Sequence, residues 1–81
     1  TDTHVYAGMD LHIGNTSDSQ NGVQIQTATD GNGYVMFGDG SGTDAFQGQV
    51  SYNHTNDYLR LVAGGGERAR IWANRFVVNE N

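Results

Sequence analysis

The chain has 81 residues, no cysteine, and a formal net charge of −5 with only four basic residues. These values exclude a disulfide framework, and they leave no basic stripe that would neutralise phosphates, so we expect no binding to nucleic acid. A single domain of this size buries only about 60–65% of its unfolded surface, so it needs a metal or partner chains to complete its core.

The first 33 residues predict one pair of strands. Apolar and polar residues alternate over residues 3–13, which indicates a long strand or two short strands bent at Gly8. A second alternation, Val23 to Thr29, predicts a second strand with one apolar face. Asp30-Gly31-Asn32-Gly33 follows, and both of its dipeptides favour a tight hairpin turn.

Residues 34–81 predict a second unit of the same domain, built from short strands and tight turns. Runs of β-branched and aromatic residues are separated by clusters of Gly, Asn, Asp and Ser, and no window from Tyr34 to Ile71 has the period of an amphipathic helix. The predicted strands are 34–37, 46–52, 58–62 and 67–71, with turns at 38–44, 53–57 and 64–66. We therefore expect one all-β domain of short antiparallel strands over residues 1–81.

The expected strands have no protection at their edges. Sheets in soluble proteins avoid pairing with other chains by placing lysine, proline or inward charges on edge strands, and this chain has neither lysine nor proline. Partner copies of the chain would cover such edges. No apolar run approaches the roughly 20 residues of a membrane-spanning helix, so we expect no membrane insertion.

The Asp/Gly loops carry oxygen atoms that could bind a metal ion. Asp30 and Asp39 begin loops rich in oxygen ligands, but the twelfth residue from each is Ser41 or Val50, not the glutamate that an EF-hand requires. The three histidines, His4, His12 and His54, lack close zinc-ligand spacing. Because turn chemistry alone explains the loops, we predict no metal and no other cofactor.

Catalytic motifs are also missing from the sequence. There is no cysteine or lysine nucleophile, and no Gly-x-Ser-x-Gly elbow. The Gly38–Gly42 loop has no following lysine or helix, and Asp39 would repel a phosphate. A carboxylate pair such as Asp39 and Asp44 leaves glycan hydrolysis open as an alternative, but we expect no enzyme.

Glu67, Arg68 and Arg70 are the predicted oligomer interface. Alternation places Arg68 and Arg70 on one face of a strand, and Glu67, Ala69 and Ile71 on the other. Guanidinium groups pair well with carboxylates, so these residues suit ion pairs between chains. The alternative is that they are solvated surface charges.

The order of motifs over residues 34–71 resembles a β-repeat segment of phage tail fibres and tail spikes, found upstream of endosialidase-type intramolecular chaperone domains. The resemblance lies in Phe37-Gly38-Asp39 before a Gly/Ser/Asp loop, in Tyr52-Asn53-His54 at a turn, and in Glu67-Arg68-Ala69-Arg70-Ile71 after glycines. Residues 11–33 match more loosely, and Trp72 to Val78 replaces the glycine-rich continuation usual in the family. The resemblance implies a homotrimeric β-prism or fibre module, with chains intertwined or side by side.

This resemblance implies a structural component of a viral tail fibre or spike, located extracellularly on the virion surface, in contact with other virion proteins and used in host attachment. The alternatives are a decoration protein of a capsid or filament, and a fibre-borne glycan depolymerase. A host glycan would meet aromatic and amide side chains, for which the candidates are His54, Asn56, Tyr58 and Trp72. The large aromatics Tyr58 and Trp72 are also expected to pack in a core or interface.

Overall fold

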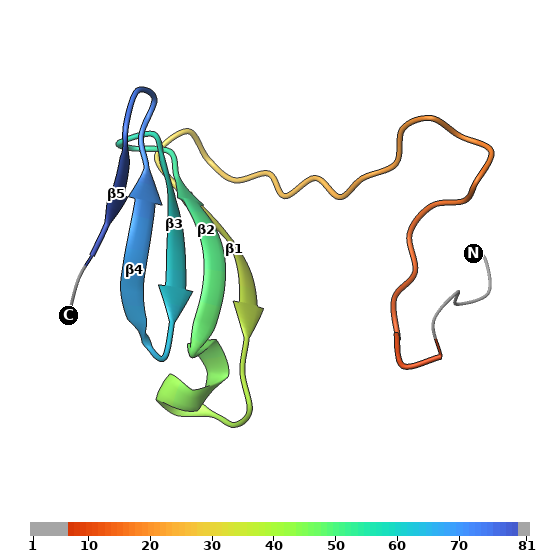
Figure 1. The fold of residues 1–81 in the computed structure, drawn as a ribbon, viewed down its shortest axis with the longest axis horizontal. Helices are drawn as coiled ribbons and strands as arrows, with labels where there is room; N and C mark the ends of the chain where they lie inside the picture. Colours follow the sequence, from red (N-terminus) through yellow and green to blue (C-terminus); the bar gives the residue numbers. More distant parts are fainter. Residues whose placement is uncertain (1–6, 80–81) are drawn as a thin grey trace.

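The computed structural model describes residues 7–79, which form an extended arm followed by one open antiparallel sheet (Figure 1). The five strands lie side by side in chain order, so each strand pairs with the next. The elements are β1 (Asn32–Phe37), the 3-10 helix η1 (Gly42–Phe46), β2 (Gly48–Asn53), β3 (Tyr58–Ala63), β4 (Gly66–Ile71) and β5 (Phe76–Val78). The all-β prediction is therefore confirmed.

The four strands expected after Tyr34 all form, with small differences at their ends. β2 begins two residues later than predicted, because Phe46 ends η1 and does not join the sheet. β5 adds a fifth strand of three residues that the sequence analysis did not predict. Within residues 7–79, no helix has the length and apolar character needed to cross a membrane.

The expected first pair of strands is absent from residues 7–31, and this prediction is wrong for the single chain. Residues 3–6 of the first expected strand lie outside the described residues. A turn does form before β1, but two residues earlier than predicted: the Gly31 amide donates to the Ala28 carbonyl at 3.0 Å, and Asn32 and Gly33 of the predicted turn belong to β1. It does not close a hairpin, because the arm runs away from the sheet and meets no strand with which to pair (Figure 1).

The strand register gives the sheet two unlike faces. Residues directly opposite one another in antiparallel strands point to the same side, and alternate residues point to opposite sides. One side, which we call the apolar face, carries two rows across the strands: Val35, Val50, Leu61, Ala69 and Val78, then Tyr52, Leu59, Ile71 and Phe76. The other side, the polar face, includes Tyr34, Gln49, Ser51, Tyr58, Arg60, Val62, Glu67 and Arg70.

Burial within the single chain is greater on the polar face than on the apolar face. Of the five buried residues within 7–79, Tyr58, Val62, Gln49 and Ser51 lie on the polar face and only Ala69 lies on the apolar face. On the apolar face, Val35 is 47% exposed, Phe76 60% and Val78 59%. Apolar side chains normally provide the core of a sheet protein, so a single copy of this chain leaves most of its core material in contact with solvent.

The chain is more extended than a compact domain of its length. The radius of gyration is 15.6 Å, whereas a compact domain of this length has a radius of about 12 Å. The difference reflects the arm, which extends beyond the β1 side of the sheet (Figure 1).

The β3–β4 connection is a two-residue turn at Gly64 and Gly65, with φ angles of 61° and 79°. Positive φ at both central residues is what a type I′ turn requires, and this turn follows the twist of the paired strands. The glycines of this turn therefore set the register of β3 and β4.

We expect Gly64→Ala to lower the free energy of unfolding by about 1–2 kcal/mol, because a β-carbon is unfavourable in the left-handed region. Gly64→Asn should stay close to the wild type, since asparagine tolerates this conformation and is favoured in type I′ turns. Chemical denaturation of the two variants measures the difference. Equal losses for Ala and Asn would contradict the assigned turn.

Candidate functional site

A β-bulge in β4 determines which charged side chains meet. The pairing with β3 passes from Leu61 opposite Ala69 to Val62 opposite Glu67, so Arg68 is the extra residue. One extra residue shifts the alternation of the bulged strand. Glu67 and Arg70 consequently lie on the same face, and the prediction that Glu67 faces away from Arg70 is wrong.

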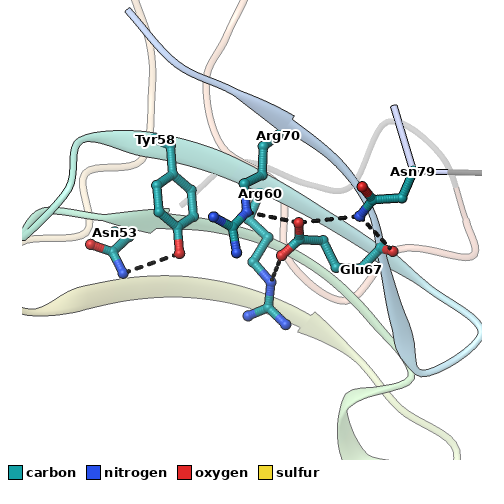
Figure 2. A network of polar contacts seen from close by, with 6 residues as sticks. All are labelled: Asn53, Tyr58, Arg60, Glu67, Arg70 and Asn79. Carbon is teal, nitrogen blue, oxygen red and sulfur yellow. Dashed lines mark hydrogen bonds and ion pairs between the residues drawn. The ribbon is translucent and has the colours of Figure 1, made fainter. Parts of the chain in front are cut away.

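Glu67 is held between two arginines on the polar face (Figure 2). Its Oε1 accepts a hydrogen bond from Arg60 Nε at 3.0 Å, and its Oε2 accepts one from Arg70 Nε at 2.7 Å. Asn79 Nδ2 donates to the same Oε2 and to the Glu67 carbonyl, both at 3.3 Å. The side chain of Glu67 is 19% exposed, so both carboxylate oxygens are occupied and partly shielded from water.

The strand register places two arginines side by side, and the Glu67 carboxylate offsets their repulsion. Arg60 and Arg70 lie directly opposite each other in β3 and β4, and like charges at such a position repel. Glu67 forms an ion pair with each of them, which turns a repulsive pair into an attractive group of three charges.

Aromatic rings extend the group of charges towards the end of the sheet. The Arg70 guanidinium carbon lies 4.2 Å from the centre of the Tyr58 ring, and the Tyr58 and Trp72 rings are 4.8 Å apart. The Arg75 guanidinium carbon lies 5.2 Å from the centre of the Trp72 ring. Such cation–π contacts contribute about 0.5–1 kcal/mol each when exposed and more when desolvated, and here they fix the orientation of the half-buried Trp72.

A small polar pocket lies beside these residues. It has a volume of about 40 Å³ and is lined by Asn32, Tyr34, Ser51, Asn53, Tyr58 and Arg60. A cavity needs about 10–15 Å³ of such volume to hold one water molecule, so the pocket has room for water but not for a sugar ring.

The β2–β3 turn presents polar groups at the same end of the sheet. His54 and Asn56 are exposed, and the His54 ring packs against Tyr52 with centroids 4.8 Å apart. The Asn56 amide donates to Asn53 Oδ1 at 2.9 Å. The turn also holds the arm, since the His54 amide donates to the Gly31 carbonyl at 3.0 Å.

The meander brings all four predicted receptor-binding residues to one end of the sheet, because β2 and β4 end there and β3 begins there (Figure 1). They are not equally accessible. His54 and Asn56 are exposed, Trp72 is half-buried, and Tyr58 is only 8% exposed. The packing role expected for Tyr58 is therefore confirmed.

The three predicted interface residues separate into two groups. Glu67 and Arg70 pair within the chain, whereas Arg68 Nε donates to the Ala63 carbonyl at 2.9 Å and lies at the glycine turn. Sequence reasoning missed Arg60, Arg75 and Asn79. Arg60 could have been found because it lies in an alternating strand that pairs with the strand carrying Arg70. The contact of Asn79 with Glu67 depends on β5, for which the sequence had no clear strand signal.

Residues 7–79 contain no group of three or more His, Asp or Glu side chains arranged to hold an ion. The Asp39–Asp44 loop instead closes on itself, since the Asp39 amide donates to the Asp44 carbonyl at 2.9 Å.

Comparison of the chain with models of known protein families, with curated proteins and with solved structures finds no match.

Charge pairing makes the stability contributed by Glu67 depend on pH. The hydrogen bond from Arg70, helped by the charges of Arg70 and Arg60 and opposed by partial burial, holds the pKa of the Glu67 carboxyl below its usual value of 4.5. A carboxyl whose pKa is lower in the folded state stabilises the fold above its unfolded pKa and loses that effect as the pH falls through the folded pKa.

We expect Glu67→Gln to lower the melting temperature at pH 7 by several degrees, corresponding to about 1–2 kcal/mol. The difference from the wild type should shrink as the pH falls below 4.5, where the wild-type carboxyl also becomes neutral. Thermal melts from pH 7 to pH 3 test this, with Asp10→Asn in the exposed arm as the control. A constant difference over this range would show that the charge of Glu67 is not the cause.

Proposed function

We propose that this chain is a structural segment of a phage tail fibre or tail spike, assembled as a homotrimer on the virion surface and contributing to host attachment. The motif order over residues 34–71 supports the family assignment. The observation that carries the proposal is the exposure of the apolar face, which indicates that one copy is only part of the folded unit.

The isolated chain lacks what a stable small domain requires. None of its described side chains is fully buried, and only three hydrophobic residues are buried at all. It also has no cysteine with which to form a disulfide. Small domains without disulfides or metals depend on oligomerisation for stability, and a fibre segment meets this need through symmetric copies.

The end of the sheet that carries His54, Asn56 and Trp72 is the proposed contact for a host glycan. Two exposed polar side chains and a half-buried indole lie there, and sugars are bound by stacking on aromatic rings and by hydrogen bonds to amide and imidazole groups. The Tyr58 ring packs against the indole of Trp72, with ring centres 4.8 Å apart.

Light scattering at micromolar concentration should give a mass three times the chain mass of 8.8 kDa. This result follows if partner copies supply the missing core. A folded monomer that persists on dilution would overturn the proposal.

A glycan array probed with the assembled protein tests the attachment site. We expect weak, specific binding that is lost in His54→Ala or Asn56→Ala and kept in Thr16→Ala, a polar control in the arm. Binding that survives both turn variants would place the contact elsewhere, and cleavage of a bound glycan would favour the depolymerase alternative.

A further inference from the structure

The arm carries a chemical feature that neither the polar network nor the proposed glycan contact uses. Asn21 is followed directly by Gly22, in a part of the arm that belongs to no strand, helix or turn. Asparagine is a thermolabile residue, because the backbone nitrogen of the next residue can attack its side-chain amide. A glycine in that next position has no β-carbon to hinder the attack, and it allows the widest range of backbone conformations.

Both reacting groups of this dipeptide are accessible. Asn21 and Gly22 are exposed, and a β-carbon built on Gly22 would meet no atom within 4 Å. Neither the Asn21 side chain nor the Gly22 amide forms a hydrogen bond to another residue within 7–79. On one side the Asn21 side chain packs against Gly14, where its Cγ lies 3.1 Å from the position of an added β-carbon. No described hydrogen bond therefore holds the Gly22 nitrogen away from the Asn21 Cγ.

The other Asn-Gly dipeptide of the chain, Asn32-Gly33, is held by the sheet. Both residues lie in β1, where Asn32 pairs with Asn53 and Gly33 pairs with Tyr52. Gly33 is half-buried, and Ile25 of the arm lies over it, with its Cγ2 3.3 Å from the position of an added β-carbon. In an extended strand ψ is about +135°, which keeps the next nitrogen out of the ring-closing position. This dipeptide can therefore react only after β1 opens locally.

The other asparagines of the chain have no glycine after them. Asn15, the other asparagine of the arm, is also fixed by its neighbours: its Oδ1 accepts from the Ser17 amide at 2.8 Å and from the Asp18 amide at 3.0 Å, and its Nδ2 donates to Asp18 at 3.0 Å. Within residues 7–79, Asn21 alone combines a following glycine with an exposed position outside the strands.

We propose that Asn21-Gly22 is a site of spontaneous deamidation. The Gly22 nitrogen gives up its proton to hydroxide and attacks the Asn21 Cγ, so that a bond from nitrogen to Cγ forms, the bond from Cγ to Nδ2 breaks, and ammonia leaves. The cyclic imide then takes up water at either ring carbonyl. Opening at Cγ gives aspartate, and opening at the backbone carbonyl gives isoaspartate. Water is the only co-reactant, and the inference does not depend on the proposed function.

The reaction changes the surface charge of the arm. Either product replaces a neutral amide with a carboxylate, so each conversion makes the chain one charge more negative than its initial −5. The sheet should remain intact, because the arm joins it further along the chain, where the His54 amide donates to the Gly31 carbonyl and the Thr55 hydroxyl to the Asp30 carbonyl, both at 3.0 Å. The protein therefore gains negative charge slowly and irreversibly, at one place outside the sheet.

The two Asn-Gly dipeptides give a matched test in the wild-type protein. Cleavage before aspartate separates them, since residues 18–29 carry Asn21 and residues 30–38 carry Asn32. After incubation of the native protein in warm, mildly alkaline buffer, mass spectrometry of the two peptides should show conversion at Asn21 at least roughly tenfold faster than at Asn32, because Asn32 reacts only in molecules in which β1 has opened. In denaturant the two rates should become similar.

Two variants identify the reacting groups. Gly22→Ala should slow conversion at Asn21 severalfold, because a β-carbon crowds the attacking nitrogen. Asn21→Gln should prevent the appearance of the more acidic species in ion-exchange chromatography of the incubated protein, since the longer side chain closes its ring far more slowly. Both variants should keep the wild-type melting temperature, because neither group forms a hydrogen bond within the described chain.

Equal rates at Asn21 and Asn32 in the native protein would overturn the inference, as would the absence of conversion at Asn21. An acidic species that forms in Asn21→Gln at the wild-type rate would also overturn it, since the charge would then come from another residue. Fast conversion at Asn21 that is lost in Asn21→Gln supports the assignment, whatever the number of chains in the assembled protein.

Discussion

A sheet of one layer has two faces, and both must be shielded from water or be suited to it. In this chain the middle of the polar face is shielded by its own side chains, since Arg70 lies over Tyr58 and Gln49 and Ser51 are buried beneath their neighbours, while Tyr34 and Met36 in β1 are 42% and 45% exposed. The apolar face has no such cover. The arm and the open edges of the sheet likewise lack partners in a single chain. The fold of one chain is therefore less complete on its apolar side.

The bulge at Arg68 allows the polar side to be complete. It rotates Glu67 to the face that carries Arg60 and Arg70, and one carboxylate then neutralises two opposed guanidinium groups. In a regular strand the Glu67 side chain would point to the apolar face, where it would have no ion-pair partner. Arg60 and Arg70 would then repel each other. A single inserted residue thus moves the Glu67 carboxylate from the side of the apolar rows to the face that carries Arg60 and Arg70.

The sequence predicted the sheet from β1 to β4 because period-two alternation and glycine or asparagine turns act over a few residues. It failed for the arm because alternation shows which face a strand would present, but not whether another strand pairs with it. It also misplaced Glu67, since nothing in Glu67-Arg68-Ala69-Arg70 marks a bulge. The turn that carries His54 and Asn56 was predicted from its polar residues, whereas the contact of Arg75 with Trp72 depends on the chain folding back after β4.

The loop between β1 and β2 is rigid where it leaves the sheet and free at its tip. A β-carbon on Gly38 would clash with the Ala45 carbonyl oxygen, so the two ends of the loop approach each other through bare backbone. At Gly42 the same construction meets no atom within 4 Å. Loops whose ends are fixed and whose tips are open accept insertions at little cost to stability. Around Gly42, whose own φ of 64° favours glycine, the chain can therefore accept insertions and acquire new surface chemistry without disturbing the strands on either side.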